Sequence, residues 1–284
     1  MQTPAPYGPI DYLVVGHLSE DCTPEGIRLG GTAAYSALTA RSLGMRVGIV
    51  TAWDKDLPLH SLQSIPIAGE TVEQSTIFEN TQTDNGRQQW LHHVAPSLDY
   101  YHIPETWRTA GIVHLGPIAQ EVEPSLVRHF PDAFIGATAQ GWLREWDIDG
   151  KVFNAEWPEA PFVLNQLDAT VISIEDVSSD ESRIEEMADV GQVFAVTEGA
   201  EGARVYWQDE VRHFPATHAT EIDSTGAGDI FATAFFIQLQ RTANPWKAAE
   251  FANEIAAISV TRTGLESIPG PDEIYSIYSA QVKV

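Results

Sequence analysis

Short apolar runs separated by helix-like segments constrain the fold of this chain more than any other feature. Each run suits a strand that is buried on both faces. After the first run, Gly30 and Gly31 precede a helical pattern over 32–43, which Gly44 closes. This strand–helix–strand order predicts a mainly parallel sheet. The predicted strands cover residues 10–15, 46–51, 111–115, 133–138, 170–174 and 193–197.

The remaining segments complete a single three-layer α/β/α domain over residues 1–284. Residues 71–94 interrupt the alternation: two arms without a clean buried face flank Asn85–Gly86, a strong hairpin signal. They predict a small β flap beside the main sheet. A late hairpin is expected over 203–214. Helices are expected at about 121–130, 180–190, 226–240 and 246–262.

Composition limits the class of protein. The chain has 284 residues, of which 43% are hydrophobic, enough for one large α/β domain. No apolar run is long enough to span a membrane, and the N-terminal residues do not resemble a signal peptide. The single cysteine, Cys22, excludes an internal disulfide and fits a cytoplasmic protein.

The charge balance is strongly acidic. The net charge is −24, from 40 acidic residues against 16 Lys and Arg. Such a surface repels nucleic acid and anionic membranes, so neither is an expected partner. Two interpretations stay open: an ordinary acidic protein, or adaptation to a salty cytoplasm. A salt series of activity distinguishes them.

The stretch that says most about a possible reaction is EIDSTGAGDIFATAFFIQLQ, residues 221–240. Apolar residues recur at helical spacing after Gly226, Ala227 and Gly228, so a packed helix begins there. Small residues let an anion approach the free N–H groups of the helix N-terminus. Asp229 could simply complement the helix dipole, worth about 0.3–1 kcal/mol. An acid beside an anion hole is also what phosphoryl transfer to an alcohol requires.

The same stretch identifies a family resemblance. DSTGAGD followed by an apolar helix resembles the C-terminal signature of the PfkB family of carbohydrate kinases, which have the ribokinase-like fold. Gly30–Gly31 and the segment after it resemble the N-terminal motif of that family. TEGAEGA, residues 197–203, resembles its nucleotide loop, and residues 250–269 resemble its C-terminal nucleotide-contacting helix. The likeness covers nearly the whole chain.

The resemblance implies roles at the reaction centre and the donor site. Asp229 would be the catalytic base, and Gly226, Ala227 and Gly228 would form the anion hole. Asp176 would bind Mg²⁺ through water, and Asp223 would help to hold a monovalent cation such as K⁺. The residues expected to bind ATP are Thr197, Gly199, Gly202 and, at the adenine, Asn253.

The resemblance also implies which residues bind the acceptor, and here the chain departs from the family pattern. Asp21, Gly31, Tyr35 and Arg144 are the expected acceptor residues, although Arg144 could instead be a packing arginine at the edge of the core. Tyr35 replaces the asparagine that touches the sugar in ribokinases, which argues against ribose itself. Ser173 replaces the amide of the magnesium motif. The short segment between Asp21 and Gly30 predicts two main flap strands.

Other functional classes lack their motifs. Gly150–Lys151 is followed by Val152, which rules out a P-loop, and neither a dinucleotide fingerprint nor a G-x-S-x-G elbow occurs. His92 and His93 are adjacent on a strand and point to opposite faces, so a shared metal is not expected. The alternative from another class is a catalytically silent ligand-binding protein with the same fold.

The sequence therefore predicts an ATP- and Mg²⁺-dependent kinase. Its acceptor would be a hydroxyl of a small neutral sugar, an inositol-like polyol or a nucleoside. The flap is the expected surface for a homodimer.

Overall fold

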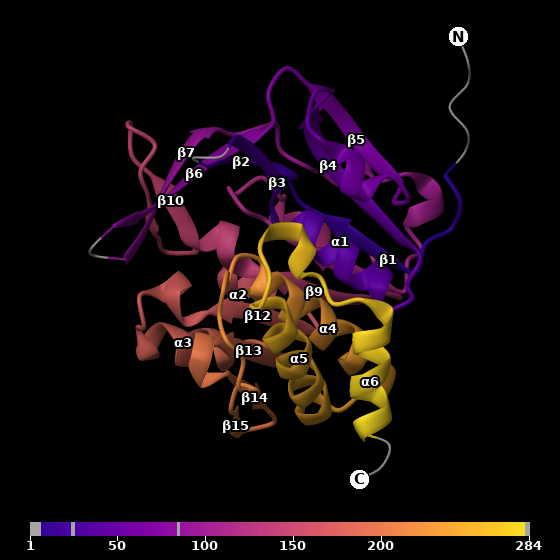
Figure 1. Ribbon diagram of the computed structural model, residues 1–284, viewed down its shortest axis with the longest axis vertical. Coiled ribbons are helices and arrows are strands. Elements are labelled where there is room, and N and C mark those ends of the chain that lie inside the picture. The colour runs from indigo at the N-terminus through magenta and orange to yellow at the C-terminus, as the bar shows by residue number, and fades with distance from the viewer. Residues whose placement is uncertain (1–6, 24–25, 84–85, 282–284) are drawn as a thin grey trace.

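The computed structural model describes residues 7–23, 26–83 and 86–281. A nine-stranded sheet forms its centre (Figure 1). All neighbouring strands run parallel except β13, β14 and β15, which pair antiparallel. From edge to edge the strands are β15 (Glu210–Phe214), β14 (Ala203–Trp207), β13 (Val193–Thr197), β12 (Ala169–Ser173), β9 (Phe134–Thr138), β8 (Ile112–Leu115), β1 (Tyr12–Val15), β4 (Val47–Asp54) and β5 (Ile67–Val72). The six strands predicted from apolar runs and the late hairpin are confirmed.

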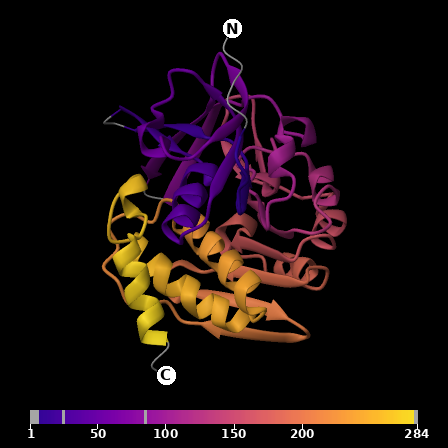
Figure 2. The ribbon, with the colours of Figure 1, turned by 90° about the vertical axis from the view of Figure 1, so that its right-hand side faces the viewer.

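Helices cover both faces of this sheet (Figure 2). One face carries α1 (Thr32–Ser42), α4 (Ala227–Thr242), α5 (Pro245–Ser259) and α6 (Pro271–Gln281). The other carries α2 (Ala160–Leu164) and α3 (Glu181–Ala188). Alternate residues of β1 face the two layers, Tyr12 and Val14 toward the first and Leu13 and Val15 toward the second. The predicted three-layer α/β/α architecture is confirmed.

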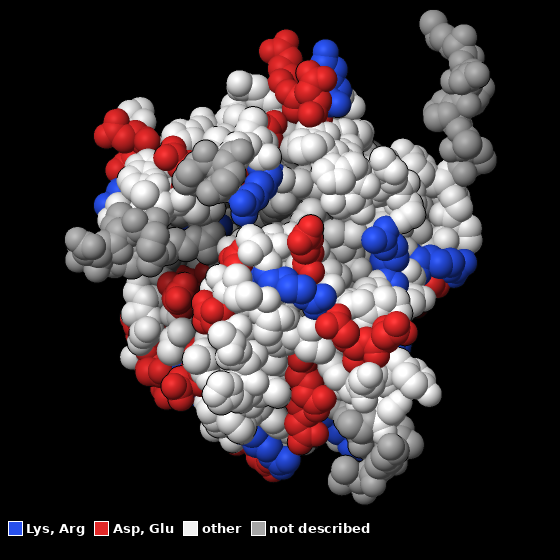
Figure 3. All heavy atoms as spheres, in the orientation of Figure 1, with Lys and Arg blue, Asp and Glu red and all other residues white. Residues whose placement is uncertain are grey.

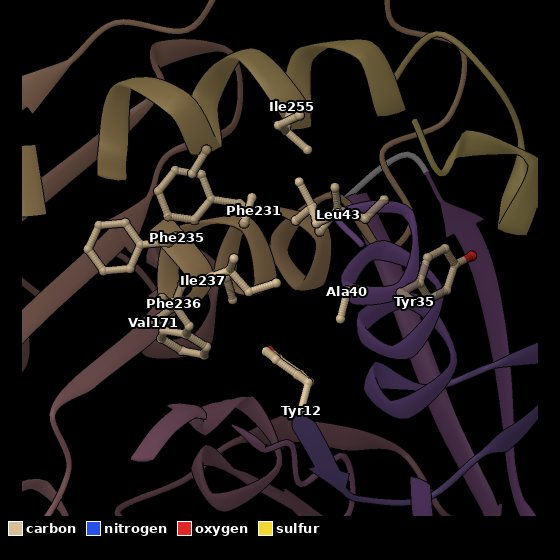
Figure 4. Close-up of a cluster of buried hydrophobic side chains, with 14 of the residues drawn as sticks. Tyr12, Tyr35, Ala40, Leu43, Val171, Phe231, Phe235, Phe236, Ile237 and Ile255 are labelled. Carbon is tan, nitrogen blue, oxygen red and sulfur yellow. The ribbon is translucent and has the colours of Figure 1, made fainter. Parts of the chain in front are cut away.

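Helix α4 lies at the centre of the first layer. Ten of its residues, from Ile230 to Leu239, are buried. Figure 4 shows Phe231, Phe235, Phe236 and Ile237 of this helix in the apolar cluster that also holds Ile255 of α5. Burying each such side chain stabilises the fold by about 1.5–3 kcal/mol, so the helix and its N-terminus are firmly fixed.

The flap is a separate four-stranded sheet, in the order β3–β2–β6–β7. Its strands are β2 (Ser19–Thr23), β3 (Gly26–Gly30), β6 (Thr76–Thr83) and β7 (Gly86–His93). The expectation of two main strands is wrong, because the short segment after Asp21 folds into a hairpin that pairs with β6. The predicted turn residue Asn85 lies outside the described residues, and residues 71–72 belong to β5.

A further hairpin, β10 (Arg144–Trp146) and β11 (Val152–Asn154), joins the flap. The amide of Leu91 on β7 donates to the Gly150 carbonyl at 2.8 Å. The helix expected over 121–130 is only the 3₁₀ turn η4 (Pro124–Arg128). The other 3₁₀ turns are η1 (Leu59–Leu62), η2 (Tyr100–His102), η3 (Glu105–Trp107), η5 (Ala139–Leu143), η6 (Ile174–Val177), η7 (Gly199–Glu201) and η8 (Gly264–Ser267).

The surface reflects the acidic composition. Figure 3 shows several patches of acidic side chains on one face of the molecule, with basic side chains between them. Among the described residues, no helix combines the length and apolarity that crossing a membrane requires.

Candidate active site

The N-terminus of α4 lies at the carboxyl ends of the parallel strands. Gly226 caps the helix with a left-handed backbone, φ 79°. A Cβ there would lie 2.2 Å from the ring of Tyr35, so both the backbone angle and the packing require glycine. A Cβ on Gly228 would meet nothing within 4 Å, so the first turn of the helix is open at that point. The Ala227 amide donates to the Ser224 carbonyl at 3.1 Å, so the expected anion hole depends on the N–H groups of Gly226 and Gly228.

Asp229 follows this opening and is partly exposed. The hydroxyl of Thr32, at the start of α1, donates to its Oδ1 at 2.7 Å. Burial of the carboxyl group raises the pKa of Asp229 to about 6, against the lowering effects of Thr32 and Arg144. The negative charges of Asp176 and Asp21 add to the increase. A carboxyl group with this pKa is a weak acid poised to act as a base near neutral pH.

Arg144 lies within electrostatic reach of both Asp229 and Asp176. It begins β10, and its guanidinium donates to the Ile118 carbonyl at 3.3 Å. The same group lies 5.9 Å from the ring centre of Phe78 on the flap. Arg144 therefore places a positive charge between the flap and Asp229, and such a charge could bind an anionic group.

Asp176 is buried and held by two hydrogen bonds. Its Oδ2 accepts from the Ser173 amide at 2.8 Å, and its Oδ1 accepts from the Gln140 side chain at 3.1 Å. Ser173 in turn caps the 3₁₀ turn η6, so serine and aspartate form a capping box. Burial raises the pKa of Asp176. A nearby cation would favour its charged form.

A cleft of about 1270 Å³ lies between the flap, α1 and the segments 221–225 and 263–271. Asp21 lines it from β2, together with Arg28 of β3 and Asn80 of β6. Asp21 pairs with Arg28 and Phe78 across the strands, so these three side chains point to one face of the flap. Arg28 and Asn80 were not among the predicted site residues, because neither GIRLG nor TIFENTQT shows a clear strand alternation in the sequence.

Tyr35 and Gly31 were expected to contact the acceptor, and the structure packs both of them more closely than an open contact with a sugar would require. Tyr35 lines the cleft, but it is only 4% exposed, and its ring packs against the α-carbon of Gly226. Gly31 has φ 87°, and a Cβ there would lie 2.4 Å from the carbonyl oxygen of His17. The Tyr35 ring therefore lies between the cleft and the N-terminus of α4 and contacts both.

The expected donor residues lie around the end of β13. Gly199 has φ 57° and open space around it, whereas a Cβ on Gly202 would lie 2.0 Å from the Phe214 carbonyl oxygen. Thr197 donates to the Ile172 carbonyl at 3.3 Å. Asn253 is buried and donates to the Phe214 carbonyl at 2.9 Å. The side chain of Asn253 thus supports the exit of β15 rather than facing open space.

Asp223 joins two loops near the anion hole. Its Oδ1 accepts from the Thr225 amide at 2.9 Å, and its Oδ2 accepts from the Gly264 amide at 3.1 Å. The part of the chain that the structure describes has no cluster of three His, Cys, Asp or Glu side chains able to hold a metal. In particular, His92 pairs with Glu79, and His93 contacts the Ser75 carbonyl.

The structure adds Thr32 to the candidate site. The sequence showed Thr32 only as the first residue after the double glycine. Its partner Asp229 lies 197 positions away, so no local pattern could have paired them. The candidate site that results combines a carboxyl group of raised pKa, an open helix N-terminus and one arginine. The cleft beneath the flap adjoins it at Tyr35 and Thr225, but Asp229, Gly31 and Arg144 are not among the residues that line this cleft.

Comparison with known proteins agrees with this architecture. A kinase in the ribokinase family that depends on pyrophosphate, solved with a pyrophosphate analog and myo-inositol, superposes with a TM-score of 0.79 at 18% identity, over 93% of this chain and 99% of that one. Ribokinase of Arabidopsis thaliana, solved with ribose and ATP, gives a TM-score of 0.73 at 16% identity, over 95% and 98%. The fold is therefore ribokinase-like.

Sequence comparisons also find similar proteins. Residues 159–271 match the model of the pfkB family carbohydrate kinase. A probable fructokinase-2 of Arabidopsis thaliana is 25% identical over 89% of this chain and 88% of its own length. The match to this carbohydrate kinase family over residues 159–271 confirms the resemblance found in the motifs of the chain.

Proposed function

We propose that this protein transfers the terminal phosphoryl group of ATP to a hydroxyl of a small neutral sugar, polyol or nucleoside. The observation that carries the proposal is the position of Asp229, directly beside the open N-terminus of α4. A phosphoryl group at the helix N-terminus and a hydroxyl at Asp229 would be adjacent, as the reaction requires. The silent ligand-binding alternative has no comparable use for a carboxyl group with a pKa of about 6.

Each residue of the site then has a chemical task. Asp229 accepts the proton of the acceptor hydroxyl as its oxygen attacks phosphorus. The N–H groups of Gly226 and Gly228 and the guanidinium of Arg144 stabilise the charge on the transferred group, and the Ala227 amide would join them only by leaving the Ser224 carbonyl. Thr32 orients the carboxyl group of Asp229 through its hydrogen bond. Asp21 and Gly31 bind the acceptor, and the Tyr35 ring packs against it.

A divalent cation fits the charge distribution of the site. Burial is the main cause of the raised pKa of Asp229, and the negative charges of Asp176 and Asp21 add to it, so a cation nearby would offset this charge. We infer that Asp176 would hold Mg²⁺ through water, because Mg²⁺ retains its waters. When bound, Mg²⁺ neutralises phosphate charge. Asp223, with the carbonyls of its two loops, suits a monovalent cation such as K⁺.

The donor site follows from the loop at 197–202. We infer that Thr197, Gly199 and Gly202 line the nucleotide, with the open Gly199 nearest to it. Asn253 contributes by fixing the end of β15 unless nucleotide binding releases its amide. One structural relative depends on pyrophosphate, so pyrophosphate belongs beside ATP in any donor assay.

The assembly and location are part of the proposal. We expect one kinase domain over residues 1–284, a homodimer formed through the flap, and a cytoplasmic location consistent with the single Cys22. Sedimentation velocity of the wild type and of a variant with charged substitutions on the exposed face of β3 tests the dimer. A monomer at every concentration contradicts it.

The replacement Asp229→Asn tests the function most directly. Asn preserves the shape of the side chain but cannot accept the proton, so turnover should fall by about 10²–10⁴-fold. ATP affinity should change little, because the backbone N–H groups remain. Steady-state kinetics with ATP and pyrophosphate against a panel of sugars, polyols and nucleosides measures both. Undiminished turnover per folded molecule would mean that the base lies elsewhere, with Asp223 the next residue to replace.

A further inference from the structure

The chain passes between the central sheet and the flap at four places, because the flap consists of two antiparallel strand pairs, β2–β3 and β6–β7 (Figure 1). His17 lies at the first passage, between the end of β1 and the start of β2, and is fully buried. The second passage is at Gly31 after β3, the third at Thr76, the first residue of β6, and the fourth at Pro96 after β7. The three later passages all contact His17.

The side chain of His17 joins the third and fourth passages. Its Nδ1 lies 2.7 Å from Thr76 Oγ1, and its Nε2 lies 3.0 Å from the Pro96 carbonyl oxygen. Thr76 Oγ1 also accepts from the Ala95 amide at 3.0 Å. At the second passage, a Cβ on Gly31 would lie 2.4 Å from the His17 carbonyl oxygen, so the two backbones approach each other closely. All four passages therefore meet at one buried histidine.

The Pro96 carbonyl fixes the proton positions of this contact. A carbonyl only accepts, so His17 Nε2 carries a proton and donates to it. Burial lowers the pKa of His17, so the ring is neutral and its Nδ1 accepts from the Thr76 hydroxyl. That hydroxyl gives its one proton to His17 and accepts from the Ala95 amide. Both ring nitrogens and the hydroxyl are thus satisfied, and a fully satisfied buried network fixes one arrangement of its members.

The backbone of His17 is held from the side of the central sheet. The carboxyl group of Glu121 is 2% exposed and accepts from the His17 amide at 3.0 Å. It also accepts from the amides of Ile118 at 2.9 Å and Ala119 at 2.7 Å, in the segment that follows β8. Strands β1 and β8 are neighbours in the sheet. Glu121 therefore ties the first passage to the ends of two central strands.

The same contacts lie between two parts of the candidate active site. On one side, the Ile118 carbonyl accepts from the Arg144 guanidinium, which is within electrostatic reach of Asp229. On the other side, Asp21 lies on β2, which pairs with β6, and Ser19 Oγ donates to Asp21 Oδ1 at 2.8 Å. The position of the flap relative to the central sheet thus sets the position of Asp21 relative to Arg144.

We propose that His17, Thr76 and Glu121 form a joint that fixes the flap, and with it Asp21, relative to Arg144 and Asp229. The inference rests on the proposed function for its kinetic consequence. The three residues of the joint are positioning residues, because none of them lines the cleft and they act on the acceptor only through the flap. A flap held in place in advance lowers the cost of ordering Asp21 when the acceptor binds.

The most direct test is Thr76→Val, which removes the hydroxyl and keeps the branched shape that suits a strand. We expect kcat/KM for the acceptor to fall by about 10- to 100-fold, because small displacements of a substrate-positioning group cost that much. KM for the donor should stay within about twofold, since the expected donor loop follows β13, which the joint does not contact. Steady-state kinetics with each substrate varied in turn, using the acceptor that the wild type phosphorylates in the panel of sugars, polyols and nucleosides, measures both values.

Two control variants separate positioning from loss of stability. Thr76→Ser retains the hydroxyl and should keep kcat/KM for the acceptor near the wild-type value. Thr39→Val makes the same exchange at another buried threonine, whose hydroxyl donates to the Tyr35 carbonyl within α1. It should lower the melting temperature without changing the acceptor kinetics. The positioning role is refuted if Thr76→Val behaves as the wild type, or if either control lowers kcat/KM for the acceptor as much as Thr76→Val does.

Two further measurements need no turnover. ¹⁵N NMR should show His17 as the Nε2-protonated neutral tautomer, and an Nδ1-protonated ring would overturn the proposed joint. Hydrogen–deuterium exchange of residues 19–23 and 76–83 should be faster in Thr76→Val than in Thr39→Val, and equal rates would also overturn it. A wild type without turnover on any donor and acceptor would sink the proposed function, while these two measurements would still decide the joint.

Discussion

At the scale of single residues, the role proposed for Asp229 makes the activity depend on pH. Its carboxyl group must be ionised to accept a proton, and its pKa is raised to about 6 by burial. We therefore expect kcat/KM to fall about tenfold for each pH unit below pH 6. A pH series from 4.5 to 8 on the wild type measures the acid limb. A limb near pH 4 would mean that Asp229 is solvated in solution.

The same pKa has a consequence for stability. Asp229 binds its proton more tightly in the folded protein than in the unfolded chain, where its pKa is near 3.8. Its contribution to folding stability is therefore complete below about pH 4 and is lost as the pH rises through 6. Asp229→Asn should gain stability relative to the wild type between these values. Melting temperatures of both proteins at pH 4 and pH 7 test the sign.

Thr32 influences the pKa of Asp229. Its hydrogen bond lowers the pKa of Asp229, so Thr32→Val should move the acid limb of kcat/KM to higher pH. The control is Thr39→Val, which removes a buried hydroxyl of α1 that bonds only to the Tyr35 carbonyl. An acid limb that shifts equally in both variants would show that the effect is not local.

At the scale of elements, replacing Gly226 or Gly228 at the start of α4 by alanine should have opposite effects on stability. Gly226→Ala places a methyl group against the Tyr35 ring and forces alanine to φ 79°, so stability and activity should both fall. Gly228→Ala meets no atom within 4 Å and improves helix propensity, so stability should hold or rise by up to about 1 kcal/mol. The added methyl group should nevertheless raise KM for the donor.

Calorimetry and donor kinetics on both variants separate these demands. Tyr35→Ala should restore part of the stability lost in Gly226→Ala, because it removes the clash but not the backbone strain. Equal destabilisation by alanine at Gly226 and Gly228 would contradict this picture of the anion hole.

The elements differ in how far the sequence predicted them. The buried strands were predictable because each is a short apolar run, and α4 because its apolar rows repeat at helical spacing. The hairpin β2–β3 was not, since SEDCT and GIRLG have little strand character and owe their conformation to pairing with β6. Asp229 and the small residues before it are contiguous in sequence and could be singled out as candidates, whereas Thr32, Arg28 and Asn80 come to the candidate site only through the fold.

At the scale of the whole molecule, the net charge of −24 predicts a dependence on salt. Self-repulsion between surface carboxylates destabilises the compact state, and salt screens it within about 10 Å at 0.1 M. The melting temperature should therefore rise as NaCl increases from 0.05 to 1 M. Sucrose at matched osmolality is the control.

Activity over the same salt series distinguishes the two interpretations of the acidic surface. Activity greatest at low salt, with only a small gain in melting temperature, identifies an ordinary acidic protein. A melting temperature that does not respond to NaCl would contradict the self-repulsion argument. Comparing KCl with NaCl at equal ionic strength also isolates any effect of a cation bound at Asp223.

The position of β1 has a consequence for synthesis on the ribosome. This strand lies inside the sheet between β4 and β8, whose paired residues begin at Val47 and Ile112. At about 5–20 residues per second, β1 therefore waits on the order of 5–20 s for its second neighbour to emerge. By contrast, six later strands are neighbours in the sheet in the order in which they are translated: β8, β9, β12, β13, β14 and β15. The nascent chain must keep β1 unpaired on one side until then, so its early residues are the part most exposed to misassembly and to chaperone binding during translation.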